Sequence, residues 1–274
     1  MKKIAIQGIE GSNHHIVADK FYQEDISLEK CLSFDALVES LTSKKSEQAV
    51  MAIENTIAGS IIPNYALIDK YNLHISGEYY LPIHHHLMAL PNQSIEEIKE
   101  VCSHPMALLQ CKEFFKQHRH IKLVEDVDTS AIAQRIADKQ LKGVAAIAPK
   151  MAADIFNLEV LEDEIQTIKN NATRFVILQT SNPENGKDNI NKASLKFELD
   201  HKRGSLAAIL NVMSDCKLNL TKIQSLPKIE TPWKYAFFVD VTFDTYEDYA
   251  KAKAIIEIMA TDFKILGEYK NGRS

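Results

Sequence analysis

Short apolar runs and helical periodicities alternate along the first two thirds of the chain. Apolar runs typical of buried strands occupy residues 2–9, 48–53, 121–124, 144–148 and 172–178. Apolar residues at helical spacing occupy residues 13–22, 34–43, 60–70, 108–117 and 129–139. One or two strands are predicted over 73–90, and a short helix with a capping-box spacing over 94–101. This alternation predicts an α/β fold with a mostly parallel sheet.

The last part of the chain has a different pattern. A polar, turn-rich stretch over 180–189 shows no periodicity and predicts a linker. Beyond it, strands are predicted over 193–199, 218–229, 233–243 and 263–269, with helices over 204–216 and 247–260. The order βαββαβ is typical of a ferredoxin-like unit. An open sheet edge in such a unit favours pairing with a second copy of the chain.

The predicted organisation is therefore a two-lobed α/β region over 1–180, a linker over 181–192 and a βαββαβ domain over 193–274. One lobe would comprise about 1–72 and 165–180, and the other about 73–164. A cleft between two lobes is a common place for a small-molecule site.

Composition narrows the range of partners. Of the 274 residues, 45% are hydrophobic and 25% are charged, and the net charge is −5. No basic stripe occurs, so nucleic acid is not an expected partner. No apolar run reaches the length of a signal-peptide core or a membrane span, and the four cysteines are scattered, which predicts a cytoplasmic protein with free thiols.

The segment 49–60 is the first that could carry chemistry. Its apolar run ends in Glu54 and Asn55, and Gly59-Ser60 follows where a new helix could begin. Open α/β sheets bind small molecules beyond the carboxyl ends of their strands, so these side chains could face a ligand. An ordinary strand that ends in a helix cap would give the same pattern.

A second segment, 102–111, combines a helix start with polar side chains. Pro105 suits the first turn of a helix, and Ser103 or His104 would lie near its cap. Ser103 and Gln110 are two helical turns apart, so both can share one face. The alternative is a capped helix with a buried Cys111.

The third segment, 170–178, places Arg174 in an otherwise apolar strand next to Thr173. A guanidinium in an internal strand requires an anionic partner, which could be a ligand carboxylate or a structural carboxylate of the protein.

The histidine clusters do not predict a metal site. The three consecutive histidines 84–86 alternate between strand faces, and His14-His15 lacks helical ligand spacing, so structural or surface roles are expected. The Gly8-x-x-Gly11-Ser12 turn lacks the third glycine of a dinucleotide fingerprint and predicts a strand-to-helix turn capped by Ser12.

These segments together make the chain resemble the prephenate dehydratases, monofunctional enzymes of phenylalanine biosynthesis with a C-terminal ACT regulatory domain. The resemblance covers essentially all of the chain, and its motifs occur in the family's order: Gly8-Ile9-Glu10-Gly11-Ser12, Ile53-Glu54-Asn55-Thr56-x-x-Gly59-Ser60, Ser103-His104-Pro105-x-Ala107-Leu108-x-Gln110-Cys111 and Thr173-Arg174-Phe175. It implies a catalytic domain with two lobes, similar to periplasmic binding proteins, followed by a ferredoxin-like ACT domain.

The resemblance also implies an activity and roles for residues. The family converts prephenate to phenylpyruvate by losing water and carbon dioxide, with no cofactor. Thr173 matches the family's proton or hydrogen-bond donor, and Glu54 and Asn55 accompany it as catalytic residues. Substrate binding is expected at six positions: Arg174, Phe175, Ser12, Ser60, Ser103 and Gln110.

The first motif departs from the family pattern. Ile9, Asn13 and His14 stand where a proline, an aromatic residue and a small hydroxyl residue are usual.

The regulatory part matches less closely. Gly204-Ser205-Leu206 corresponds to the family's Gly-Ala-Leu motif, whereas Gln224-Ser225-Leu226-Pro227 replaces Glu-Ser-Arg-Pro and loses both charged residues. The resemblance implies that L-phenylalanine binds near Gly204, Leu206 and Asn219 as an allosteric effector, in a homodimer or a dimer of dimers.

Two other functions are compatible with these residues. Arogenate dehydratase differs only in one group of the substrate, and a non-catalytic amino-acid sensor could share both folds. The intact Thr173-Arg174 pair favours an enzyme, because a sensor needs no proton donor beside its anion-binding group.

Overall fold

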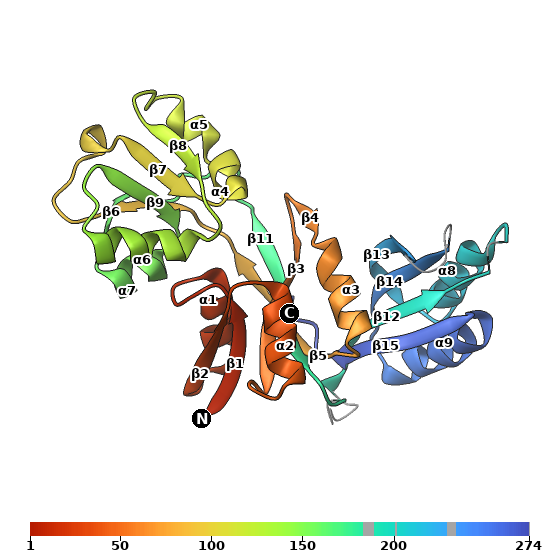
Figure 1. Ribbon diagram of the computed structural model, residues 1–274. Coiled ribbons are helices and arrows are strands. Elements are labelled where there is room, and N and C mark those ends of the chain that lie inside the picture. Colours follow the sequence, from red (N-terminus) through yellow and green to blue (C-terminus); the bar gives the residue numbers. More distant parts are fainter. Residues whose placement is uncertain (183–188, 201, 229–233, 274) are drawn as a thin grey trace. The chain divides into compact units, whose positions relative to one another are not determined.

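The computed structural model describes residues 1–182, 189–200, 202–228 and 234–273 (Figure 1). They form two compact units. The first comprises residues 1–59 and 81–175, and the second 60–80 and 176–274. The division falls within three strands, β4 (Gly59–Ser60), β5 (His74–Pro82) and β11 (Ala172–Gln179).

A parallel sheet forms the first part of unit one. Its strands are β1 (Lys2–Gln7), β2 (Ile26–Cys31) and β3 (Gln48–Asn55), in the order β2-β1-β3, and the start of β11 lies beside β3. The connecting helices are α1 (Asn13–Tyr22) and α2 (Phe34–Thr42). Ser12 and Ser33 cap these helices through their side chains, which satisfies backbone N–H groups that lack helical partners.

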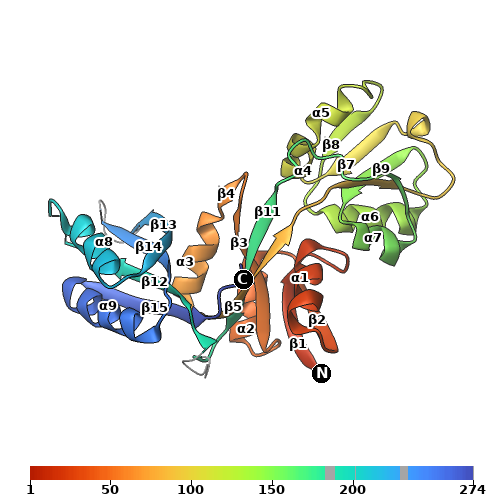
Figure 2. The ribbon, with the colours of Figure 1, turned by 180° about the vertical axis from the view of Figure 1, so that it is seen from behind.

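A second sheet is mixed, in the order β10-β6-β9-β7-β8. Its strands are β6 (His86–Ala89), β7 (Glu100–Ser103), β8 (Lys122–Glu125), β9 (Val144–Ala148) and β10 (Glu159–Glu162). Both faces of this sheet are apolar. Successive residues of a strand point to opposite faces, so they belong to two separate apolar clusters. The helices α4 (Pro105–Gln110) and α5 (Lys112–Phe115) pack on one face, and α6 (Thr129–Lys139) and α7 (Lys150–Phe156) on the other (Figures 1 and 2).

Two glycines in the turn before α1 lie close to α7 and to the residue that caps α6. Gly11 has a φ of 80°, and a Cβ atom at this position would lie 2.8 Å from Ala152 Cα in α7. A Cβ at Gly8 would similarly lie 2.7 Å from Asp128 Oδ2. At Gly11 the close atom belongs to the backbone, so packing requires glycine there, whereas at Gly8 the Asp128 side chain can move and the φ of 95° is what favours glycine.

Unit two contains α3 (Ile62–Lys70), β5 (His74–Pro82) and a four-stranded antiparallel sheet. The sheet consists of β12 (Lys192–Glu198), β13 (Asn219–Pro227), β14 (Tyr235–Thr242) and β15 (Asp262–Tyr269), in the order β13-β14-β12-β15. The helices α8 (Ser205–Asp215) and α9 (Tyr246–Met259) share an apolar core with it. The predicted βαββαβ order is confirmed, and this strand order is ferredoxin-like.

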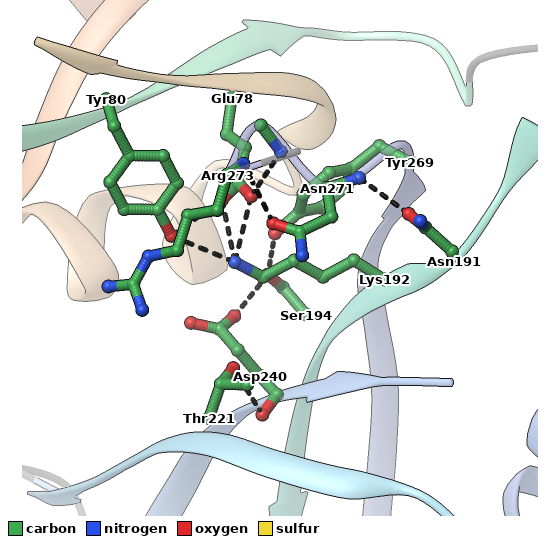
Figure 3. A network of polar contacts seen from close by, with 11 residues as sticks. Glu78, Tyr80, Asn191, Lys192, Ser194, Thr221, Asp240, Tyr269, Asn271 and Arg273 are labelled. Carbon is green, nitrogen blue, oxygen red and sulfur yellow. Dashed lines mark hydrogen bonds and ion pairs between the residues drawn. The ribbon is translucent and has the colours of Figure 1, made fainter. Parts of the chain in front are cut away.

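A buried polar network joins β5 to the sheet of unit two (Figure 3). Lys192 Nζ lies 2.9 Å from both carboxylate oxygens of Glu78 and donates to the Tyr80 hydroxyl at 3.0 Å. The Lys192 and Glu78 side chains are only 3% and 0% exposed. The C-terminal segment closes over this pair, since Gly272 N donates to Glu78 Oε1 and the Arg273 guanidinium lies over the Tyr80 ring.

Two helix predictions are wrong in detail. The predicted helix over 94–101 is a single 3-10 turn, Ile95–Glu97, with the expected capping box, and then strand β7. The apolar residues Val101 and Cys102 pair with β8 and β9, so strand pairing overrides the helical spacing. The predicted helix over 108–117 begins earlier, at Pro105, and is interrupted at Cys111.

Besides β7, four of the described elements were not predicted: β2, β4, α7 and β10. The strands β2 and β10 lie at sheet edges and carry charged residues, which hides their apolar alternation. Part of the predicted linker, 183–188, lies outside the described residues. None of the described helices is long and apolar enough to cross a membrane.

Candidate functional site

Asn55, the last residue of β3, has an amide orientation set by the backbone. Its Oδ1 accepts hydrogen bonds from the N–H groups of Ile57 and Ala58, each at 2.9 Å. An oxygen can accept these two bonds and an NH2 group cannot. The Nδ2 group of Asn55 is therefore directed to the opposite side, toward β11.

Asn55 Nδ2 donates to Thr173 Oγ1 at 2.9 Å and to Asn171 Oδ1 at 2.7 Å. Thr173 is 8% exposed, and Asn55 is its only side-chain hydrogen-bond partner within the described part of the chain. Because Thr173 Oγ1 accepts this bond, its own hydroxyl hydrogen is left to donate elsewhere. A hydroxyl that accepts a hydrogen bond is also polarised into a stronger donor.

Two further polar side chains extend this network from Asn171 to the end of α4 and to the residue before β6. Asn171 Nδ2 donates to Gln110 Oε1 at 2.9 Å, and Gln110 Oε1 lies 2.7 Å from His85 Nε2. Asn171 and His85 are 2% and 7% exposed, whereas Gln110 is half-buried at the end of α4. The structure thus joins the ends of β3 and α4 through the residue that precedes β11.

The remaining predicted site residues of β3 and β11 are buried or half-buried. Arg174 is 3% exposed, and Phe175 is 1% exposed with its ring 5.0 Å from the His14 ring. Burial lowers the pKa of His14 to about 3, so this histidine is neutral, and its Nε2 accepts from the Ala52 backbone N–H at 3.4 Å, a structural role as expected. Glu54 is half-buried at the end of β3.

Three predicted serines are not among the residues brought together here. Ser12 accepts from the His15 backbone N–H as the cap of α1, and Ser103 donates to the Ile147 carbonyl at 2.8 Å. Ser60 lies in unit two, where its hydroxyl accepts from Lys222 Nζ.

The predicted regulatory residues all lie in unit two. Gly204 begins α8 with a φ of 84°, and Leu206 follows in its first turn. Two cavities lie at this helix start, one lined by Leu206 and the other by Gly204, and the charged side chains Asp200 and Lys202 line both. Asn219, Gln224, Ser225, Leu226 and Pro227 are part of β13. Leu226 is 9% exposed, so the residue that replaces the motif's arginine is buried.

Sequence reasoning did not identify Asn171 or His85 as part of the site. The three histidines 84–86 have separate partners: Glu164 contacts His84, Gln110 contacts His85, and Asp163 contacts His86. Because successive side chains of an extended segment alternate between its two sides, alternation alone would have placed His85 on the opposite side from His84 and His86. No group of three or more potential metal ligands occurs among the described residues.

The fold and the site define a two-lobed α/β protein that carries an amide and hydroxyl network at its strand ends and a ferredoxin-like domain. The chain belongs to the prephenate dehydratase family, whose model matches residues 4–183. This membership confirms the resemblance seen in the sequence.

A curated relative supports this family, and solved structures share the fold. Arogenate dehydratase/prephenate dehydratase 2 of Arabidopsis thaliana is 33% identical over 97% of this chain and 72% of the relative. A prephenate dehydratase from Arthrobacter aurescens, solved in complex with L-Phe, has a TM-score of 0.86 at 22% identity, covering 99% of this chain and 90% of that one. GqqA, described as a novel type of quorum-quenching acylase, has a TM-score of 0.87 at 23% identity over 98% of both chains. At these identities the two structures show a common fold.

Proposed function

We propose that the protein is a prephenate dehydratase that forms phenylpyruvate from prephenate. The observation that carries this proposal is the bond from Asn55 Nδ2 to Thr173 Oγ1, which orients a hydroxyl as a donor. Family membership supports the same reaction.

The chemistry requires one proton and no oxidant or reductant. The ring hydroxyl of prephenate takes up a proton and leaves as water, and the C–C bond to the ring carboxylate breaks to release carbon dioxide. The electron pair of that bond completes the aromatic ring. Thr173 would donate a hydrogen bond or proton to the departing hydroxyl, and aromatisation makes modest donation sufficient. Solvent would restore the proton.

The other predicted residues have proposed roles in holding the dianionic substrate. Arg174 would supply positive charge, and Gln110 would donate from its amide. Glu54, Phe175, Ser12, Ser60 and Ser103 are proposed to shape or line the pocket.

We further propose that residues 1–180 form the catalytic domain and 193–274 an ACT domain regulated by L-phenylalanine. The ferredoxin-like strand order supports this, as do the cavities beside Gly204 and Leu206. A homodimer or dimer of dimers would use the open sheet edges. The four free cysteines support a cytoplasmic location.

Purified protein is expected to convert prephenate to phenylpyruvate, and added phenylalanine is expected to suppress the rate. The measurement is phenylpyruvate absorbance under alkaline conditions, with and without phenylalanine. Activity that phenylalanine does not change would retain the enzyme and contradict the regulatory proposal. No activity on prephenate would contradict the proposed substrate.

Arogenate is the second candidate substrate, because the Arabidopsis relative is named for both activities. Phenylalanine formation from arogenate, measured in the same preparation, separates the two substrates. A protein that binds these ligands without turnover would instead be a sensor.

Replacing Asn55 with aspartate is expected to slow turnover strongly, although the two side chains have the same shape. A carboxylate cannot donate to Thr173 Oγ1 and would accept its hydrogen instead, so the hydroxyl would be turned away from the substrate. We expect kcat to fall about 100-fold or more. Activity of Asn55→Asp close to wild type would contradict the donor orientation of Thr173.

A further inference from the structure

We infer that His85 is a positioning residue that holds Gln110 with its NH2 group available to the substrate. The orientation of the Gln110 amide follows from hydrogen-bond geometry. The expected effect on kinetics rests on the proposed function. His85 is outside the motifs on which the resemblance rests.

The donor and acceptor of each hydrogen bond in the network can be assigned, starting from backbone groups whose roles are fixed. The backbone N–H groups of Ile57 and Ala58 orient Asn55, so Asn55 Nδ2 is the donor to Asn171 Oδ1. The Thr56 hydroxyl gives a second constraint. Its oxygen accepts from the Ala172 backbone N–H, and its hydrogen is left to donate to the same Asn171 Oδ1 at 3.4 Å, which agrees with Asn171 Oδ1 as the acceptor.

With its oxygen committed, Asn171 can only donate toward Gln110. Gln110 Oε1 accepts from Asn171 Nδ2 at 2.9 Å, which leaves His85 Nε2, at 2.7 Å, as a second donor to the same oxygen. The network therefore requires the His85 tautomer that carries its hydrogen on Nε2. Burial lowers the pKa of His85, the hydrogen bond to Gln110 opposes this and the neighbouring His84 and His86 add to it, so the net shift favours the neutral ring.

These two hydrogen bonds fix the orientation of the Gln110 side-chain amide. Two donors hold its oxygen, so its NH2 group points out of the network, and no partner for that group is found among the described residues. An amide in this orientation donates to an anion. The opposite orientation would present an oxygen to a dianionic substrate and repel it.

The kinetic test compares His85 with its neighbour. In His85→Leu, Gln110 loses one of two donors and can rotate, so we expect kcat/KM for prephenate to fall about tenfold. His85→Gln restores an N–H at the position of Nε2 and is expected to recover most of this loss. The matched control is His84→Leu, an adjacent and partly exposed histidine that contacts Glu164, which should retain wild-type kinetics.

A second variant separates the orientation of Gln110 from the donor itself. Gln110→Glu can still accept from both Asn171 and His85, but it has no NH2 group and adds negative charge. We expect its KM for prephenate to rise more than tenfold with the fold unchanged. If the wild type is active and His85→Leu has the same kcat/KM, the inference is overturned and the proposed function stands.

The tautomer can be tested without activity. Nitrogen-15 NMR of the full chain should show the His85 ring neutral with its hydrogen on Nε2, with His85→Leu identifying the signal. The same tautomer should persist in Gln110→Glu. A hydrogen on Nδ1 would overturn the inference, even if the protein turned over neither prephenate nor arogenate.

Discussion

Thr173→Ala is expected to bind substrate and lose turnover. The substitution removes the hydroxyl that Asn55 orients, while the neighbouring strand residues, which are buried and apolar apart from Arg174, retain their packing. Positioned proton donation contributes roughly 100-fold to 10,000-fold, so kcat should fall by at least about 100-fold. KM should change little, because the substrate carboxylates would be held by other groups. The measurement is steady-state phenylpyruvate formation together with equilibrium binding of prephenate.

The control for this prediction is Thr173→Ser. Serine keeps the hydroxyl and its bond to Asn55 but loses the methyl group, so activity should stay within about tenfold of wild type. Equal turnover by Thr173→Ala and wild type would exclude Thr173 as the donor. Binding without turnover in the wild type would favour the sensor.

Lys192→Met is expected to destabilise the protein more than any surface substitution. The methionine would leave the Glu78 carboxylate, which is 0% exposed, without the ammonium group 2.9 Å from both of its oxygens (Figure 3). Removing one partner of a buried ion pair costs about 3–5 kcal/mol of unfolding free energy. Denaturant titration of the full chain at one protein concentration measures this loss.

Two further variants give this experiment its controls. The double substitution Lys192→Met with Glu78→Leu removes both charges and should recover most of the lost stability, because a buried pair often contributes little compared with apolar residues. Lys202→Met removes an ion-paired lysine whose side chain is 77% exposed and should leave the unfolding midpoint unchanged. If Lys192→Met alone were as stable as the wild type, the assignment of a buried ion pair between Lys192 and Glu78 would be wrong.

Much of the secondary structure follows from local signals. The helices α1 and α6 occupy the predicted residues because Ser12 and Asp128 cap them, and β9 follows its apolar run. The predictions failed where pairing partners decided the outcome. Val101 and Cys102 have helix-compatible spacing after a capping box, but strands on both sides provide hydrogen-bond partners for them.

The sequence alone determined the family, the α/β and βαββαβ patterns, and the motif residues Asn55, Gln110 and Thr173. It could not show that Asn171 and His85 join them. Asn55 and Asn171 are 116 residues apart, and Asn171 and Gln110 are 61 apart. Only the tertiary structure decided these contacts, because a hydrogen bond depends on the positions and directions of both groups, whereas periodicity records which residues are buried. The same reason explains why the Lys192 and Glu78 pair, 114 residues apart, could not be predicted.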